Sequence, residues 1–415
     1  MDVKTFATEV EKKIQEASGS LKDFRLTHSS LFGKTGFLPK NSETYKFSNL
    51  SRFMEEYNPA KRETLPLEIQ DYIKPEIPTL LFLDGEYLDT KTMVSGLTIK
   101  SLRECFSEVK DLFSPTDAGS NFHHSQMNDG LILEVAKNTQ MTKPLRVLYL
   151  NTRAATFTPT IILKAGTHAE VTLLEESIAL DNEFIFFGET YIQGAAGSKI
   201  EHIQLDQGRE STIFHGTTHT QIEKDANYKN VIFTFGGKFN RRNLTMNLKA
   251  AGANAESYAL YMTEGKEHTD ISTVIHHEAP DTTSNQVAKG IIDGESKAIF
   301  TGRIHIHKDA QRVASGQLNK NLLLSKKAQV HSQPQLEIFA DDVKCSHGST
   351  TGQLSDEEVF YFQTRGIPLD RAKSLLAYGF GLDIVLQISN LEARAMAEEV
   401  VKEKLKTKFK LGGEL

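Results

Sequence analysis

The residues best placed to do chemistry in this sequence are Cys345 and His347, two positions apart at the end of the strand-like run 336–348. In an extended strand, residues i and i+2 share one face, so the thiol and the imidazole are expected to point the same way. Both groups bind metals, but a closed zinc site takes four ligands and an iron–sulfur cluster usually takes four thiolates. Any metal site here must therefore take ligands from elsewhere.

The same pair also has a plain structural interpretation, as the end of a strand. A neighbouring imidazolium stabilises thiolate, so His347 could lower the pKa of the Cys345 thiol. The flanking sequence nevertheless lacks the patterns that accompany the cysteine nucleophiles of papain-like and caspase-like proteases. On residue chemistry alone, a functional thiol and a strand-end cysteine both stay open.

Histidine is the other metal-binding residue type, and the chain has 14. Close pairs occur at His123-His124, His276-His277 and His305-Ile-His307. His305 and His307 would share a strand face, but such a pair on a β surface is more often solvated or hydrogen-bonded than metal-bound. His276 and His277 would face opposite sides of a strand, which argues against joint chelation. No carboxylate pair stands out as acid and base, so the sequence does not indicate an enzyme.

Composition narrows the class of protein. With 415 residues and a net charge of -6, the chain is long enough for two or three domains and carries no basic footprint for nucleic acid or anionic membranes. Two cysteines exclude a disulfide framework, and neither a secretory signal nor a membrane-length apolar run is visible, so we expect a cytoplasmic protein. Gly33-Lys34-Thr35 lacks the earlier glycine of a phosphate-binding loop, since His28 stands there, and we expect no nucleotide site.

The sequence before Cys345 and His347 begins with residues 1–125, which predict a mostly helical N-terminal region. Apolar residues at helical spacing predict an amphipathic helix over residues 3–17. From Leu21 to Pro78, prolines and mixed polarity indicate irregular helical turns. Thr79 to Tyr87 predicts two strands joined by an Asp-Gly turn, and Ser101 to Phe113 predicts a helix.

Residues 126–348 change to short β-branched and aromatic runs, which predict a mainly β protein with a parallel β-helix core. A repeated phrase, in which a small or turn residue precedes an alternating strand, recurs at an interval of about 26 to 32 residues with one longer gap. Such an interval is typical of solenoid repeats. These phrases start at Ala165, Ala196, Asp225, Ala251, Asp293 and Ser325. A large β-sandwich is the alternative, but its regular hairpin signals are sparse here.

Residues 349–415 predict a C-terminal helical subdomain. Ser355 and Glu358 form a capping box that begins one helix. A stripe of Leu375, Leu376, Phe380, Ile384 and Ile388 indicates a second helix, although two glycines weaken its middle. Asn390 caps a third. These helices either lean on the β core or present a surface to a partner.

The sequence resembles the SufB/SufD family. The similarity is strongest over residues 335–352 and 354–367, extends over about 230–370, and includes the phrase at 38–50. Its Cys-Ser-His-Gly form at Cys345 is more similar to SufD than to SufB. The β-helix of SufB carries a cysteine thought to receive sulfur, whereas this chain has none between Cys105 and Cys345, so it is not expected to nucleate a cluster alone.

The resemblance implies a right-handed parallel β-helix flanked by helical regions, in a non-catalytic subunit of the SufB–SufC–SufD scaffold for iron–sulfur cluster assembly. It implies that the β-helix end pairs with SufB, with Cys345 and His347 as candidate ligands of a transient cluster at the shared interface. The C-terminal helices would dock the ATPase SufC, and Phe360, Tyr361 and Arg365 are the candidate contacts. ATP would enter only through that partner, and no intrinsic cofactor is expected.

Other hypotheses remain. The isolated chain is a candidate homodimer. In a second version the chain is purely a structural platform that regulates SufB and SufC, and Cys345 is a buried structural thiol. A β-helix enzyme acting on polysaccharide would fit the solenoid, but it lacks paired carboxylates on one strand face.

Overall fold

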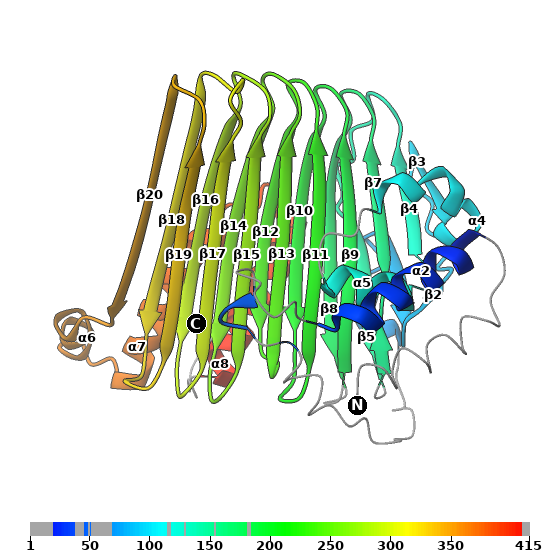
Figure 1. The fold of residues 1–415 in the computed structure, drawn as a ribbon. Coiled ribbons are helices and arrows are strands. Elements are labelled where there is room, and N and C mark those ends of the chain that lie inside the picture. The colour runs from blue at the N-terminus through cyan, green and yellow to red at the C-terminus, as the bar shows by residue number, and fades with distance from the viewer. Residues whose placement is uncertain are drawn as a thin grey trace.

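Residues 130–353 wind into a two-sided parallel β-helix, in which long strands alternate between two facing sheets (Figure 1). The computed structural model describes residues 20–37, 45–48, 50, 69–113, 118–127, 130–152, 155–180 and 184–408. The predicted helix over 3–17 and most of the phrase at 38–50 lie outside these residues. The predicted parallel β-helix is confirmed.

Nearly all strand pairs are parallel, and the exceptions lie at the N-terminal end, where β1–β2 and β3–β4 are antiparallel. The first sheet, in spatial order, contains β2 (Glu86–Leu88), β1 (Thr79–Leu83), β5 (Leu145–Asn151), β8 (Glu170–Ala179), β10 (Lys199–Gln207), β12 (Asn227–Phe235), β14 (Asn254–Thr263), β16 (Thr283–Ile292), β18 (Val313–Leu323) and β20 (Val343–Gln353). The second contains β19 (Gln329–Ile338), β17 (Lys297–Ile306), β15 (His268–His277), β13 (Phe239–Leu248), β11 (Ile213–Ile222), β9 (Phe184–Gly194), β7 (Thr160–Ala165), β4 (Gly130–Val135) and β3 (Leu97–Ser101), with β6 (Ala155–Phe157) also pairing with β9.

One corner of the solenoid repeats a left-handed backbone residue in each coil. The backbone amide of this residue donates a hydrogen bond to a carbonyl of the next coil, as Gly197 does to Lys224 and Gly252 does to Asp281. A Cβ on Gly197 would come within 2.3 Å of the His168 ring, so glycine is required there. The corner residues, in order, are Asn138, His168, Gly197, Asp225, Gly252, Asp281 and Arg312.

The sequence phrases mark two different corners. The four that start between Ala165 and Ala251 lie where the second sheet leads into the first, whereas those at Asp293 and Ser325 lie at the opposite corner. The long gap in the predicted interval is therefore a change of corner. The turn after β15, which carries Asp281, is a corner of the same kind that the sequence phrases did not include.

Burial along the strands depends on what covers the outer faces. Apolar residues from Leu80 to Val313 form the main hydrophobic cluster in the interior between the sheets. In β9 nearly every residue is buried on both faces, because N-terminal helices cover the second sheet there. In β17 and β18 buried and partly exposed residues alternate, which shows that one face of these strands meets solvent.

Within the described residues, the helical elements of the N-terminal part are α2 (Ser20–Thr35), η2 (Ile69–Tyr72), α4 (Leu102–Cys105), η3 (Phe106–Glu108), η4 (Lys110–Leu112) and α5 (Ala118–Gln126). The prediction of irregular turns was wrong for α2, a regular helix whose buried face includes Arg25, His28 and Ser29 as well as Phe32. Because that face contains polar residues, the apolar residues of α2 do not recur at helical spacing in the sequence. The predicted helix from Ser101 to Phe113 is a short α-helical turn followed by two 3₁₀ turns.

The C-terminal helices are α6 (Asp356–Gln363), α7 (Leu369–Val385) and α8 (Leu391–Lys408). The predicted caps are confirmed, because Ser355 accepts from the Glu358 amide and Asn390 from the Ala393 amide. Helices α7 and α8 pack on the outer face of the first sheet. No helix in the described residues is long and apolar enough to cross a bilayer.

The predicted stripe of α7 is confirmed at Ile384 and, just past the helix, at Ile388, which are buried, but not at its two leucines. Ala377 and Gly381 are buried, and Leu375 and Leu376 are only partly so. A Cβ on Gly381 would approach the Leu260 side chain to 3.1 Å. Small residues thus bring the helix close to the sheet, so the glycine that weakens the helix locally improves its packing.

Polar contacts also fix these helices. The Lys289 ammonium donates to Asp383 on α7 at 2.5 Å. The Glu201 carboxylate accepts from the backbone amides of Ser389 and Asn390, at 2.6 and 3.0 Å, where α8 begins. A carboxylate at a helix N-terminus satisfies amides that have no partner inside the helix.

We predict that Leu260→Ala lowers the free energy of unfolding by about 2–5 kcal/mol, because it leaves a cavity under α7 where the leucine is fully buried. Leu391→Ala removes the same atoms from a side chain that is 71% exposed, and should change stability by about 0.5 kcal/mol or less. Urea unfolding followed by circular dichroism measures both. Equal effects of the two substitutions would contradict the packing described for α7.

Candidate functional site

The two sheets end together at β19 and β20, and both last strands have a free edge. β20 pairs with β18 and β19 pairs with β17, and no described strand lies on the other side of either. Residues along both strands are partly or fully exposed, in contrast to the buried middle of the solenoid. At the opposite end, antiparallel β2 and β3 terminate the sheets. The C-terminal end therefore presents two rows of backbone hydrogen-bonding groups.

Cys345 and His347 lie on β20. Val343 and Cys345 pack against the interior core, so this register directs them toward the space between the sheets. Cys345 is aligned with Ser315 on β18, and His347 is aligned with Gln317. Cys345 is half-buried, whereas His347 is exposed because no further coil covers it. The structure thus places both residues at a free strand edge, two positions apart on one strand.

A chain of hydrogen bonds begins at the hydroxyl of Ser315, the residue aligned with Cys345, and leads into the solenoid. The Ser315 and Ser284 hydroxyls are 2.6 Å apart, and Ser284 is hydrogen-bonded to His277 Nε2 at 3.0 Å. The other nitrogen of His277, Nδ1, is 2.8 Å from the Thr282 hydroxyl. Burial lowers the pKa of His277 to about 4, so its ring is neutral at physiological pH. The polar character of the last coil therefore continues inward.

Partial burial raises the pKa of the Cys345 thiol, and a hydrogen bond with the Ser315 backbone opposes this shift only in part. The thiol is consequently protonated near neutral pH in the isolated chain. The idea that His347 lowers this pKa is wrong for the isolated chain. Metal binding at this position would have to displace a proton from sulfur.

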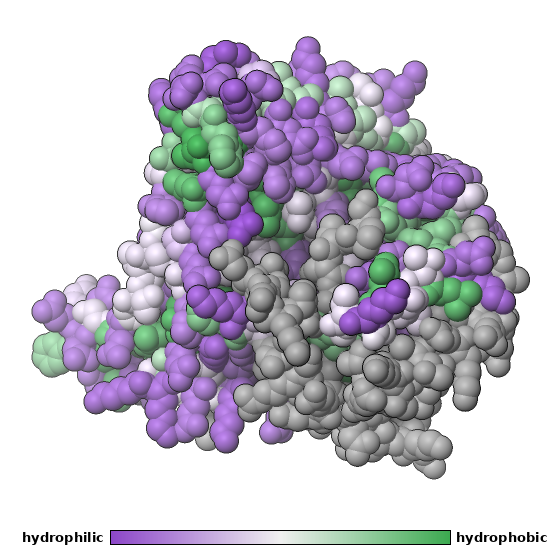
Figure 2. Space-filling view, viewed as in Figure 1, coloured by the Kyte–Doolittle hydropathy of each residue, from purple (hydrophilic) through white to green (hydrophobic). Residues whose placement is uncertain are grey.

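The three residues expected to contact a partner lie on or just beyond α6, which projects from the end of the solenoid (Figure 1). Phe360 and Tyr361 are 66% and 55% exposed, and the Arg365 guanidinium lies 3.6 Å from the centre of the Tyr361 ring. Val359 is buried and anchors the helix. In the space-filling view, hydrophobic and hydrophilic residues are mixed on this projection (Figure 2).

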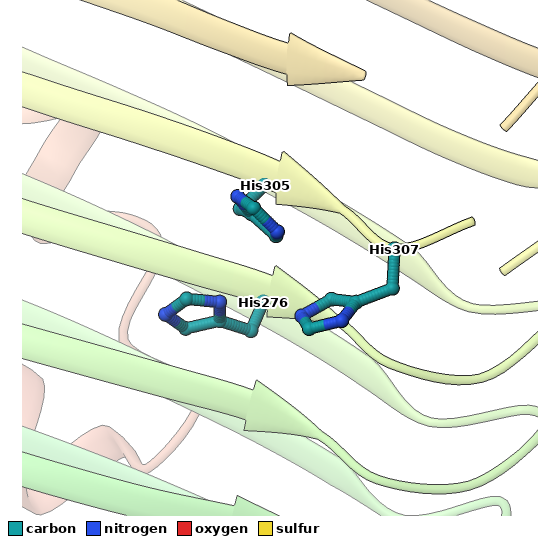
Figure 3. A group of neighbouring side chains, drawn as sticks. All are labelled: His276, His305 and His307. Carbon is teal, nitrogen blue, oxygen red and sulfur yellow. The ribbon is translucent and has the colours of Figure 1, made fainter. Parts of the chain in front are cut away.

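The structure also brings His276 next to His305 and His307, the pair that the sequence placed on one strand face. His276 on β15 is aligned with His305 on β17, and His307 follows the end of β17. All three point to the same side of the second sheet (Figure 3). As expected, His277 faces the opposite way and is fully buried. The strand register brings His276 to the pair, and the alternation pattern alone could not reveal that alignment.

Comparisons with known proteins agree on one family. The profile described as "SUF system FeS cluster assembly, SufBD core domain" matches residues 148–380. An iron-sulfur cluster assembly SufBD family protein of Synechocystis sp. is 27% identical, over 93% of this chain and 93% of its own. The iron-sulfur cluster assembly protein SufD of Escherichia coli is 28% identical, over 85% of each chain.

We predict that alkylation of Cys345 by iodoacetamide in the isolated chain speeds up with pH up to and beyond 9.0, the ordinary pKa of a thiol, because burial disfavours the thiolate. A Cys105→Ser background removes the only other thiol. The His347→Ala variant should give the same pH profile. An inflection near neutral pH that this variant abolishes would show instead that the imidazole activates the thiol. Mass spectrometry of the modified protein measures the rates.

Proposed function

This chain belongs to the SufBD family of the SUF system for iron–sulfur cluster assembly and is most like SufD, and from that membership we propose that it is a non-catalytic scaffold subunit. In this role it supplies Cys345 and His347 to an interface with a SufB-like subunit, where a cluster is held as cargo. It also docks a SufC-like ATPase through its C-terminal helices. The observation that carries the proposal is the location of both residues on β20, at the free edge of the solenoid.

A free strand edge favours pairing with another strand. The backbone groups along β19 and β20 are available for β-augmentation, in which main-chain hydrogen bonds give affinity and side chains give specificity. Pairing would also cover partly exposed apolar residues of the last coil, including Val330, Leu336 and Val343. The same edges can pair with a second copy of this chain when the SufB-like subunit is absent.

The number of ligands supports a shared site. Within the described residues, no other cysteine or histidine of this chain is grouped with Cys345 and His347 as a metal-binding cluster. A cluster usually needs four protein ligands, so two donors must be completed across the interface. Partial exposure of Cys345 lets a partner's ligand approach the sulfur from the open side.

The ATPase surface is proposed on α6. Helices α7 and α8 use their apolar faces to pack on the first sheet, whereas α6 holds two exposed aromatic side chains away from it. Aromatic residues and arginine are the residue types that dominate binding energy at protein interfaces. Movement of α6 with a bound ATPase would be transmitted to β20, because only Leu354 and Ser355 separate the two elements.

The alternative is a purely structural platform that regulates its two partners without contributing ligands. The raised pKa of the Cys345 thiol and its packing against the core favour that version, since an inert buried thiol has both properties. The two versions differ in what happens when the sulfur and the imidazole are removed without disturbing the fold.

We predict that Cys345→Ala and His347→Ala leave the three-protein complex intact but reduce iron and acid-labile sulfide in the reconstituted complex to the level of a mixture without this chain. Each variant removes one proposed ligand and no element of the interface backbone. Ser346→Ala, on the exposed position between the two, is the matched control and should retain normal cluster content. Size-exclusion chromatography verifies assembly, and iron and sulfide analysis measures the cluster.

Normal cluster content in both ligand variants would exclude the ligand role and leave the platform version. Loss of complex assembly in these variants would instead assign the residues to subunit packing.

We predict that the double variant Phe360→Ala, Tyr361→Ala weakens binding of the SufC-like ATPase by about 30-fold, because truncating a central aromatic anchor costs about 2 kcal/mol or more. Glu357→Ala changes an exposed residue of the same helix and should bind as the parent does. Isothermal titration calorimetry of the purified proteins gives both constants. Unchanged affinity in the double variant would place the ATPase on another surface.

A further inference from the structure

Three imidazoles meet on the outer face of the second sheet, away from the interior-facing residues of β20. His276 and His305 occupy aligned positions of adjacent strands, and the His307 ring turns back toward them from just beyond β17 (Figure 3). One nitrogen from each ring lies within 4.8 Å of the other two. Metal–nitrogen bonds of about 2.0–2.1 Å place tetrahedral ligand nitrogens about 3.3 Å apart, so modest side-chain rotation closes the remaining distance.

Hydrogen bonding already orients one of these rings. His305 Nδ1 lies 2.8 Å from the Glu337 carboxylate on β19, which leaves Nε2 directed elsewhere. Histidine ligands in metal sites usually have such a carboxylate on their other nitrogen, because it fixes the tautomer and makes the ligand more basic. Arg303 also contacts Glu337, at 3.3 Å, and holds this carboxylate in place.

The His307 ring has a nitrogen without a hydrogen-bond partner in the described residues. His307 Nε2 is buried, and no hydrogen-bond partner for it occurs in the described part of the chain. A buried polar atom without a partner costs free energy, which a bound metal would recover. Burial, together with the charges of His305 and His307, lowers the pKa of His276. Its ring is therefore neutral near physiological pH, which is the form that binds metals.

We propose that His276, His305 and His307 form a binding site for one divalent transition-metal ion, with Glu337 orienting His305 and a further coordination position open to solvent. Three imidazoles suit ions such as Zn²⁺ and Fe²⁺, and which of them is bound depends on availability as well as affinity. The site uses no atom of Cys345 or His347. It therefore stands or fails independently of the proposed cluster interface.

The test uses Zn²⁺ with the tag-free full-length chain carrying Cys345→Ala and His347→Ala, so that the other candidate ligands are absent. Competition with a chromophoric chelator should show one bound equivalent. His276→Ala and His307→Ala should each abolish it, and Glu337→Gln should weaken it by about 10- to 100-fold. His168→Asn is the matched control. It removes an exposed histidine far along the chain, and asparagine tolerates the left-handed backbone there.

Cobalt provides an independent readout, because bound Co²⁺ gives visible absorption bands that report its geometry. Bands that appear with the parent and disappear with His307→Ala support the site. Circular dichroism of each variant establishes that the fold is retained. Absence of a bound equivalent in the parent would overturn the proposal, and so would undiminished binding in the His276→Ala and His307→Ala variants.

Discussion

Parallel register between successive coils is the constraint on which this structure depends. Each residue of a strand lies beside its counterpart one coil away, so side chains form columns along the solenoid. Where the outer face meets solvent, neighbouring coils place opposite charges side by side on aligned strand positions, as in Lys199–Glu170 and Lys164–Glu134. Exposed ion pairs contribute little stability each, but like charges at these positions would repel in a slipped register. The columns therefore help to specify the register.

The stacked coils of a solenoid leave unpaired strands at both ends, and the two ends of this one differ in how they are covered. At the N-terminal end, antiparallel β2 and β3 terminate the sheets, and helices α2 and α5 cover the nearby face of β9. At the other end, the chain leaves β20 for α6 and then returns along the outside of the first sheet as α7 and α8. The helices thus cover a face and leave the edges of β19 and β20 open. Solenoids whose ends are not capped are prone to pair with another strand, and here the free ends coincide with a cysteine and a histidine.

The sequence predicted the features that are encoded by neighbouring residues, and missed those that depend on contacts between distant parts of the chain. Turn residues and strand alternation are local, so the β-helix, the hairpin at Asp84 and the caps at Ser355 and Asn390 could be predicted. Helix α2 was missed because Arg25 and His28 face the core, which broke the apolar period. The three-histidine cluster was missed because it requires the register of β15 against β17, and no local pattern encodes that register. The free edge next to Cys345 likewise depends on which strand comes last.

The interior columns give the terminal pair a different physical context from an isolated strand end. His347 ends a column that is polar from β10 onward and whose earlier members are almost completely buried: His202, Asn230, Ser257, Gln286 and Gln317. Cys345 ends the neighbouring column, which changes from Val171 and Ile200 to Ser284 and Ser315 as it approaches the free end. Buried polar groups cost free energy unless they are hydrogen-bonded, and Gln317 donates to Gln286 across the coils at 2.7 Å. A core that needed only packing would have kept aliphatic residues here. In the Cys345 column the polar residues already begin at Ser284, two coils before the end. The surface that Cys345 and His347 present is therefore polar because the interior columns behind it are polar, and not only because it is exposed.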